Sequence, residues 1–281
     1  MTFKTVINVD QLRELLNEPQ VVTVDCRFDL MHPQAGAQAY LQGHLPKARY
    51  LDLNQDLSGT VGANTGRHPL PNPEVFAGLL GRLGIDNSTQ IVAYDENNGS
   101  FAARLWWMLR WLGHDTVAVL DGGLKAWTAR GGALDSQEVP IQATQFFPRI
   151  EAGAVLSTAE IENLVGNLQI VLTDARSPER YAGSVEPIDS VAGHIPGAVN
   201  HPFTTNLDAD GHFLPAQTLK AQWQERLAGK DASKLVAMCG SGVTACHNLL
   251  SLELAGLPGG KLYAGSWSEW IRDSRRPIAR G

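Results

Sequence analysis

Cysteine is scarce in this sequence, which excludes a fold held together by disulfides. The three cysteines, Cys26, Cys239 and Cys246, are odd in number and lack the paired spacing of a structural zinc site. Long apolar runs are also missing, because residues 1–16 carry a polar or charged residue every few positions. We therefore expect no signal peptide or membrane-spanning helix there, and a cytoplasmic protein that does not bind membranes.

Clusters of basic residues are a further absence. The chain has 23 Lys and Arg against 29 Asp and Glu, a formal net charge of -6, and no block of Lys or Arg. Proteins that bind nucleic acid concentrate positive charge to neutralise phosphates. The composition therefore argues against nucleic acid as the main partner.

The chain is long and apolar enough for a substantial core. Its 281 residues are 43% hydrophobic and 19% charged, without the composition that is typical of disorder. This length favours two domains, although a single large α/β domain is also compatible with it.

An internal repeat decides between these alternatives in favour of two similar domains. Four motifs recur in the same order in the two halves: residues 22–27 and 171–176, 43–48 and 193–198, 91–95 and 235–239, and 122–127 and 265–270. We predict a first domain at residues 1–135, a linker at 136–156 and a second domain at 157–281.

Each half alternates short runs of Val, Ile and Leu with helical segments such as 73–83, 102–112 and 218–227. This alternation predicts an α/β fold in which each domain has a mainly parallel sheet with helices on both faces. The segment 59–73 is rich in Gly, Asn and Pro and predicts an irregular loop of the first half.

Cys239 occupies the position at which the two copies differ chemically. It directly follows the apolar run 234–238 and precedes a helical stretch, and helix N-termini at the carboxyl ends of strands favour anions. Gly240 and Gly242 can adopt φ angles forbidden to other residues, so the loop amides could surround the sulfur and stabilise its thiolate. The other loop residues expected to bind an anion are Ser241, Val243 and Thr244.

The alternative is that Cys239 is a small buried hydrophobic residue, as most free cysteines are. Asp95 stands at the matching position of the first copy, and a carboxylate cannot act as a sulfur nucleophile. The residues after it, 96–98, also lack the alternating glycines that would let the amides converge. We therefore expect the first copy to be inactive.

A cysteine beside a phosphate-sized loop is compatible with a phosphatase or with sulfur transfer. A cysteine phosphatase needs an arginine six positions after the nucleophile to hold phosphate bidentately, and that position is Ala245. The loop is therefore better suited to a smaller group, such as a sulfur atom carried as a persulfide.

Two repeated pairs have structural explanations. His44 and His194 recur in both copies although one copy is expected to be active, so we predict that they bond to the backbone. Arg27 and Arg176 follow the repeated Asp, and we predict structural ion pairs for them.

The motifs Asp174-x-Arg176, 193–198, 239–245 and 265–270 resemble those of the tandem rhodanese-domain sulfurtransferases, and the resemblance covers essentially the whole chain. It implies two tandem rhodanese-like domains, with an active cysteine in the second that cycles through a persulfide. The loop 239–245 is similar to that of 3-mercaptopyruvate sulfurtransferases. Thiosulfate enzymes of this family instead carry Arg and Lys where Gly240 and Ser241 stand.

The resemblance also implies two arginines that hold the donor's carboxylate and carbonyl. Arg180 matches the first, whereas Ile188 stands where the second is expected. Arg67, in the irregular loop of the first half, is a candidate replacement cation.

We therefore predict a sulfurtransferase that uses Cys239, Arg180 and the loop amides and needs no metal or organic cofactor. The expected partners are a small anionic sulfur donor, either 3-mercaptopyruvate or thiosulfate, and an acceptor such as cyanide, thioredoxin or glutathione, and we expect a monomer. An alternative of another class is a non-catalytic rhodanese-like binding module or scaffold. The cysteine and its glycine-rich loop in one copy argue against that alternative.

Overall fold

The computed structural model describes residues 2–281 and divides them into two compact units. The first unit comprises residues 2–59, 71–151 and 209–213. The second comprises residues 60–70, 152–208 and 214–281. Each unit therefore includes a short segment from the other half of the sequence, and the loop 60–70 belongs to the second unit.

The first unit contains a five-stranded parallel sheet with the strand order β1-β5-β4-β2-β3. Its strands are β1 (Val6–Ile7), β2 (Val21–Asp25), β3 (Ala48–Tyr50), β4 (Gln90–Tyr94) and β5 (Val117–Leu120). Every residue of β2, β4 and β5 is buried, as continuous apolar runs predict for a parallel sheet that is covered on both faces.

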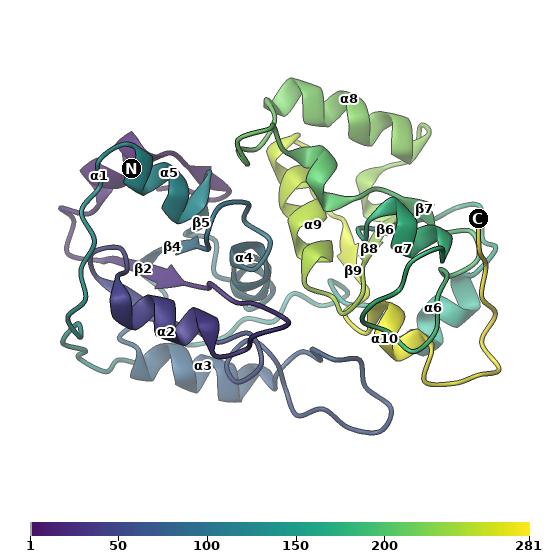
Figure 1. Ribbon diagram of the computed structural model, residues 1–281, viewed down its shortest axis with the longest axis horizontal. Helices are drawn as coiled ribbons and strands as arrows, with labels where there is room; N and C mark the ends of the chain where they lie inside the picture. Colours follow the sequence, from purple (N-terminus) through teal and green to yellow (C-terminus); the bar gives the residue numbers. More distant parts are fainter. Residues whose placement is uncertain (1) are drawn as a thin grey trace. The chain divides into compact units, whose positions relative to one another are not determined.

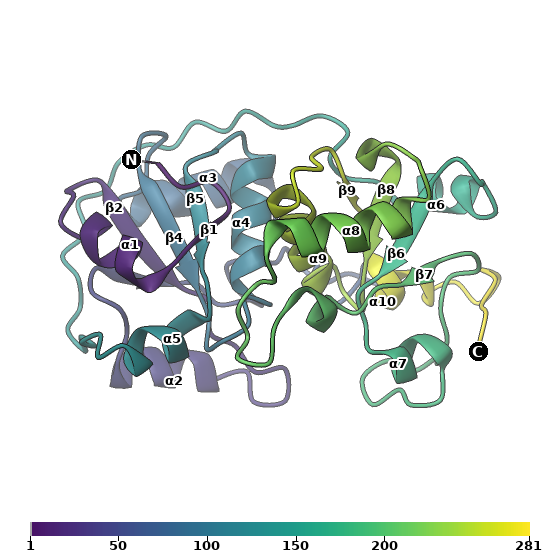
Figure 2. The ribbon, with the colours of Figure 1, turned by 90° about the horizontal axis from the view of Figure 1, so that it is seen from above.

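Helices cover both faces of this sheet (Figure 2). On one face, α1 (Val9–Leu15), α2 (Ala35–Gln42) and α5 (Gly123–Ala129) share a hydrophobic core with the strands. On the other face lie α3 (Pro73–Arg82) and α4 (Ala102–Trp111). Asn72 fixes the start of α3 because its side chain accepts the Glu74 and Val75 N–H groups, and Pro73 suits the first helical position.

The second unit repeats this design with a four-stranded parallel sheet in the order β7-β6-β8-β9. The strands are β6 (Val171–Asp174), β7 (Val199–Asn200), β8 (Leu235–Met238) and β9 (Lys261–Leu262). Val155 adds a single parallel bridge to Leu262, in the place that β1 takes beside β5 in the first unit.

The helices of the second unit also lie on both faces of the sheet (Figure 1). One face packs against α6 (Thr158–Leu164), α7 (Pro178–Ala182) and α10 (Ser266–Trp270), and the other against α9 (Thr244–Leu254), which α8 (Ala216–Leu227) contacts. Short 3-10 turns occur at Phe203–Asn206 and Ala232–Lys234. The prediction of two α/β units with parallel sheets is therefore confirmed.

The repeated Asp-x-Arg motif forms the same structure in both units. Arg27 forms an ion pair with Asp25 in which both Nε and Nη2 donate to the carboxylate. Its Nη2 also donates to the carbonyl of residue 43 at 2.7 Å. Arg176 does the same with Asp174 and the carbonyl of residue 193, again at 2.7 Å. The predicted structural ion pairs are confirmed.

The repeated histidines bond to the backbone, as predicted. The Nδ1 atom of His44 lies 3.0 Å from the Leu45 carbonyl oxygen, and that of His194 lies 2.8 Å from the Tyr181 carbonyl oxygen. Each histidine also forms an isolated antiparallel bridge through its backbone, to Asp135 and to Ala279 respectively. Each histidine therefore links its own segment to the C-terminal end of its half of the chain through backbone hydrogen bonds.

The segment 136–156 contains no helix or strand, and specific hydrogen bonds order much of it against the first unit. The N–H groups of Thr144, Arg149 and Glu151 each donate to a carbonyl of α3, α4 or the residue after it, at 2.8–2.9 Å. Phe146 is buried, with its ring 5.5 Å from that of His114. The segment is thus an ordered strap along much of its length.

Within residues 2–281, no helix combines the length and apolar character needed to cross a lipid bilayer.

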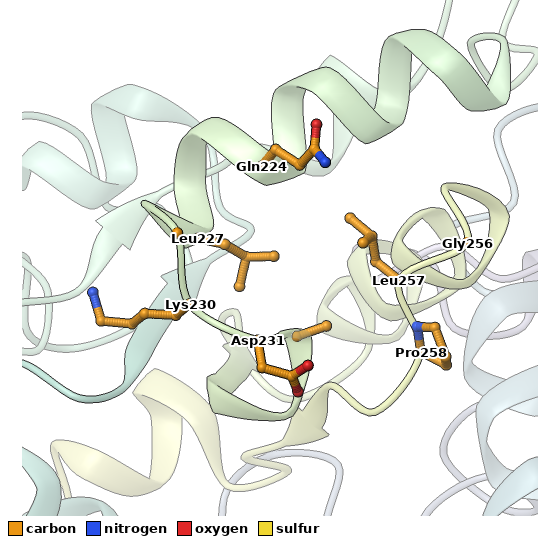
Figure 3. Close-up of a pocket in the computed structure, with 9 residues that line it drawn as sticks. Gln224, Leu227, Lys230, Asp231, Gly256, Leu257 and Pro258 are labelled. Carbon is orange, nitrogen blue, oxygen red and sulfur yellow. The ribbon is translucent and has the colours of Figure 1, made fainter.

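The second unit has a surface pocket between the C-terminal ends of α8 and α9, where Leu227 and Leu257 face a common space (Figure 3). None of the residues 239–244 lines this pocket.

Candidate functional site

Cys239 directly follows β8, at the place that Asp95 takes after β4. The register establishes this equivalence, because Met238 pairs with Asp174 as Tyr94 pairs with Asp25. The two loops are also anchored alike. The carbonyl oxygens of residues 239 and 240 accept the N–H groups of residues 267 and 268, as those of 95 and 96 accept from 124 and 125.

Ser266 fixes the backbone of Cys239 from the start of α10. Its hydroxyl accepts the Cys239 N–H at 3.0 Å and donates to the Tyr263 carbonyl at 2.9 Å. The φ angle of Ser266 is 54°, which is strained for a residue with a side chain, and Gly123 has 59° at the equivalent position. The serine thus adopts a backbone conformation that favours glycine, while its hydroxyl bonds directly to the cysteine.

The sulfur of Cys239 accepts the Gly242 N–H at 3.1 Å, and the residue is only 2% exposed. Gly242 has a φ of 77°, and a Cβ there would lie 2.4 Å from the Ala264 carbonyl oxygen. Only glycine fits this position without strain. Val243 and Thr244 follow at the N-terminus of α9, the end of a helix that carries partial positive charge.

Gly240 differs from the expectation for it. Its φ lies outside the left-handed region that Gly242 adopts. The prediction that both glycines use φ angles forbidden to other residues is therefore wrong for Gly240. A Cβ at this residue would instead lie 3.0 Å from Nη2 of Arg67 and 3.6 Å from Nη1 and Nη2 of Arg180. The missing side chain leaves room for two guanidinium groups next to the cysteine.

Two buried carboxylates hold these guanidinium groups. Nε and Nη2 of Arg180 donate to Glu186 at 2.8–3.2 Å, and Nη2 also donates to Asp189 at 3.0 Å. The other oxygen of Asp189 pairs with Arg67 Nη1, so one carboxylate bridges both arginines. Arg176 Nη1 lies 3.4 Å from Glu186.

The pKa values of the two carboxyl groups move in opposite directions. Burial opposes ionisation of Glu186, yet the hydrogen bonds from Arg180 and from backbone N–H groups lower its pKa. For Asp189, burial raises the pKa and outweighs the opposing attraction of Arg67 and Arg180. The two guanidinium groups are therefore paired with one carboxyl group whose pKa is lowered and one whose pKa is raised.

His68 is a residue that the sequence analysis missed. Its Nδ1 lies 2.7 Å from the hydroxyl of Ser241, and both side chains are buried. The loop 60–70 that carries it is anchored to α10, because the Arg67 N–H donates to Ser268 at 3.1 Å. The only sequence signal was the position of His68 next to Arg67, since no periodic pattern connects residues so far apart along the chain.

The structure thus brings Cys239, Gly240, Arg67 and Arg180 together in the second unit. Ile188 has no charged group to offer. Its side chain is 38% exposed, and its backbone N–H donates to Glu186 at 3.1 Å. Within residues 2–281, no group of three or more His, Cys, Asp and Glu side chains is arranged to hold a metal ion.

The first unit fills the equivalent loop with its own carboxylate. Asp95 is buried and accepts the N–H groups of Gly99 and Phe101 at 2.9 Å and of Ala102 at 3.2 Å. The prediction that these amides could not converge without alternating glycines is therefore wrong. Burial raises the pKa of Asp95, while these N–H groups act in the opposite direction.

The matching cation is also missing from the first unit. Ala39 precedes Tyr40 as Arg180 precedes Tyr181, and each tyrosine stacks on the repeated histidine of its own unit. A pocket beside Asp95 is lined by the acidic residues Asp29 and Glu96 and by Arg27, whose guanidinium is paired with Asp25.

Comparison with known proteins agrees with this duplicated site architecture. The family described as Rhodanese-like domain matches residues 8–130 and 157–273. A Pseudomonas aeruginosa protein named "Probable 3-mercaptopyruvate sulfurtransferase" is 47% identical over 283 residues, which cover 100% of both chains. Thiosulfate/3-mercaptopyruvate sulfurtransferase 2 of Arabidopsis thaliana is 34% identical over 302 residues, 99% of this chain and 87% of the relative.

A solved structure gives the same result for the fold. The 3-mercaptopyruvate sulfurtransferase from Leishmania major matches with a TM-score of 0.86 at 32% identity, covering 98% of this chain and 76% of that chain. The matches in sequence and in structure span both units. The chain therefore belongs to the rhodanese family and is a sulfurtransferase with two tandem rhodanese-like domains.

Proposed function

We propose that this chain moves a sulfur atom from 3-mercaptopyruvate to a thiol acceptor through a persulfide on Cys239. The observation that carries the proposal is the Cys239 sulfur at the N-terminus of α9, which accepts the Gly242 N–H beside the guanidinium groups near Gly240. Amide dipoles favour the thiolate, which is the nucleophilic form of cysteine. The guanidinium groups attract an anionic donor.

The first half-reaction forms the persulfide. The Cys239 thiolate attacks the donor sulfur, an S–S bond forms, and the C–S bond of 3-mercaptopyruvate breaks. The electron pair of that bond remains on carbon as the enolate of pyruvate, which gains a proton to give pyruvate. The hydrogen-bonded His68 and Ser241 pair is the group that we assign to this proton transfer, because it is buried beside the loop.

The second half-reaction restores the enzyme. A thiolate of the acceptor attacks the outer sulfur of the persulfide, takes that sulfur with its proton, and releases the Cys239 thiolate. We propose thioredoxin or glutathione as the acceptor. A monomer working in the cytoplasm, where such thiols are kept reduced, is the simplest setting for this step.

Thiosulfate is the second candidate donor, because one of the relatives named above carries both donors in its name. Gly240 and Ser241 add no positive charge to the loop. A loop without further cations favours a monoanion such as 3-mercaptopyruvate over a dianion. Steady-state kinetics with cyanide as the acceptor compares the two donors, and a higher kcat/KM for thiosulfate would overturn the donor assignment.

Intact mass spectrometry tests the persulfide itself. Wild-type protein treated with 3-mercaptopyruvate, without acceptor, should gain one sulfur atom. Cys239→Ser should gain none and lose turnover, whereas Cys26→Ser and Cys246→Ser should keep most of both. Those two thiols are buried, and burial raises the pKa of Cys26 well above its usual value. Sulfur on the Cys239→Ser protein would contradict the assignment, and no sulfur on the wild type would favour the scaffold alternative.

A further inference from the structure

The loop 60–70 is attached to α10 and the turn after it at three successive residues. The bonded pairs are Arg67 with Ser268, Gly66 with Glu269, and Thr65 with Arg272. In the first two pairs the loop N–H donates to a side chain, and in the third the loop carbonyl accepts, all at 3.1–3.2 Å. The loop is therefore held by its backbone directly before His68, whose ring bonds to Ser241.

The carboxylate of Glu269 connects this loop to two further elements. Its Oε2 accepts the Gly66 N–H, and its Oε1 accepts the hydroxyl of Thr158, the first residue of α6. The Thr158 hydroxyl also lies 2.9 Å from that of Tyr263, which follows β9. Both carboxylate oxygens are therefore engaged, and hydrogen bonds to an ionised acceptor are stronger than those between neutral groups.

Gly265 leaves the space that this carboxylate occupies. A Cβ at Gly265 would lie 2.5 Å from the carboxyl carbon and from Oε2 of Glu269. The φ angle of Gly265 is -59°, which any residue adopts, so its backbone conformation does not require glycine. The missing side chain instead lets the Glu269 side chain turn back toward the loop 60–70.

The first unit lacks the side chains that make these three attachments. Its residues 122–127 correspond to 265–270, and the same alignment extends two residues further. Lys125, Ala126 and Ala129 stand where the second unit has Ser268, Glu269 and Arg272. A lysine side chain cannot accept an N–H group, and alanine has no polar side chain. The attachments therefore occur in the unit that carries Cys239 and cannot form in the unit that carries Asp95.

We propose that Glu269 is a positioning residue for sulfur transfer, because it clamps the loop 60–70 so that Arg67 and His68 reach the Cys239 loop. The inference rests on the proposed function, since it assigns to Glu269 an effect on that reaction. Groups that are fixed in advance avoid the cost of ordering a loop when the donor binds. A displacement of about 1 Å can reduce a rate by about a hundredfold. Glu269 acts through the loop rather than on the reacting atoms.

Kinetics of Glu269→Ala and Glu269→Gln test this role as a pair. Alanine removes the acceptor of the Gly66 N–H, so kcat/KM for 3-mercaptopyruvate should fall by about tenfold or more, with a higher KM because Arg67 is no longer held in place. Glutamine keeps one oxygen for Gly66, and its NH2 group can donate to Thr158, so it should restore most of the activity.

The rise in KM separates positioning from a loss of folded protein, which would lower kcat and leave KM unchanged. An unchanged KM in Glu269→Ala would overturn the proposal. Equal losses in Glu269→Ala and Glu269→Gln would also overturn it, because the proposed clamp consists of hydrogen bonds that glutamine can replace.

Hydrogen exchange measures the clamp without any turnover, by mass spectrometry of a peptide that covers residues 60–70. Loss of a hydrogen bond to a charged acceptor corresponds to a factor of about ten to a hundred in an opening equilibrium. Exchange in this peptide should therefore be about tenfold or more faster in Glu269→Ala than in the wild type, and close to the wild type in Glu269→Gln. Unchanged exchange in Glu269→Ala would overturn the clamp even if sulfur transfer is confirmed. Failure of the Cys239 persulfide to form would overturn the proposed function, whereas faster exchange would still show that Glu269 holds the loop.

Glu225→Ala is the matched control, because Glu225 is an exposed glutamate of the same unit on α8. Its KM, its kcat and the exchange of residues 60–70 should equal those of the wild type. Thr158→Val removes the hydroxyl that orients Glu269, so it should change KM and exchange in the same direction as Glu269→Ala but by less. A change in Glu225→Ala as large as that in Glu269→Ala would show that any loss of negative charge moves the loop, which would overturn the specific role of Glu269.

Discussion

At the scale of single residues, the two copies differ most in what the loop amides bind. In the second unit the Gly242 N–H points to the Cys239 sulfur, which leaves a reactive atom at the helix start. In the first unit three N–H groups bind the carboxylate of Asp95. An aspartate at this position therefore occupies the anion-binding loop by itself, so that no external anion can use it.

Replacing Asp95 by cysteine should not create a second reactive site. The variant would place a thiol at the start of α4, but Ala39 stands at the position that Arg180 takes in the other unit. Asp29 and Glu96 border the adjacent pocket and repel an anionic donor, while the guanidinium of Arg27, which also lines it, is already paired with Asp25. Asp95→Cys protein treated with 3-mercaptopyruvate should still carry one sulfur atom per chain by intact mass. Two sulfur atoms per chain would show that a guanidinium is dispensable for sulfur uptake.

At the scale of elements, a buried polar network joins β7, α8 and α9. His201 follows β7, and its ring lies 4.0 Å from that of Trp223 on α8, with Nε2 3.1 Å from the Asn206 amide oxygen. Asn206 donates to Asn248 on α9 at 2.8 Å, and Asn248 donates to the His201 carbonyl at 2.9 Å. The network links the helix that begins beside Cys239 to the edge of the sheet.

This network makes stability depend on pH. Burial lowers the pKa of His201 from 6.5 to about 4, against the opposing effect of the Asn206 hydrogen bond. Between these values the unfolded chain binds more protons than the folded chain, so stability is lost as the pH falls below 6.5. The wild type should lose about 2 kcal/mol from this residue between pH 7 and pH 5.

Urea unfolding of His201→Gln at several pH values measures this contribution. The variant should be less stable than the wild type at pH 7, because it loses the ring packed on Trp223. That difference should shrink as the pH falls to 5. Leu168→Gln is the control, since this exposed side chain carries no titratable group and should leave the pH dependence unchanged. A constant difference between His201→Gln and wild type across this range would rule out His201 as the source.

At the scale of the whole molecule, each unit is completed by a segment from the other half of the sequence. Residues 60–70 belong to the second unit and bring Arg67 and His68 to the Cys239 loop. Residues 209–213 belong to the first unit, where the Phe213 N–H donates to Asp121 at 2.9 Å. The site is therefore incomplete without part of the first half of the chain, although that half carries aspartate in place of the cysteine.

Displacing the loop 60–70 should reduce activity without altering Cys239 itself. Gly66→Ala would place a Cβ 2.6 Å from the Gly265 carbonyl oxygen and 2.9 Å from the Ser268 hydroxyl, so the loop must move away from α10. We expect kcat/KM for 3-mercaptopyruvate to fall by about tenfold or more, because Arg67 moves with the loop. Gly62→Ala is the control on the same loop, since its Cβ would meet nothing closer than 3.8 Å. Equal activity of the two variants would show that the loop position does not matter.

The sequence by itself determined the features that are written in contiguous residues. The repeat, the two parallel sheets, the Asp-x-Arg ion pairs and the position of Cys239 all depend on local motifs and on short apolar runs. Such features are set by hydrophobic periodicity and by the geometry of a strand that leads into a helix. Within the site, the same local pattern identified the cysteine and its glycine-rich loop, whereas Arg180 was implied by the resemblance to the tandem rhodanese-domain sulfurtransferases.

Only the tertiary structure decided which distant side chains complete that site. It brought His68 to Ser241 and Arg67 to Asp189, pairs whose members lie more than a hundred residues apart in the sequence. It also showed why residue 240 is a glycine: a side chain there would meet the guanidinium groups of Arg67 and Arg180, whereas its backbone does not use a positive φ. No periodic signal in the sequence predicts these partners, because each depends on how separate loops pack against α10. That packing depends on tertiary contacts made by residues throughout the chain.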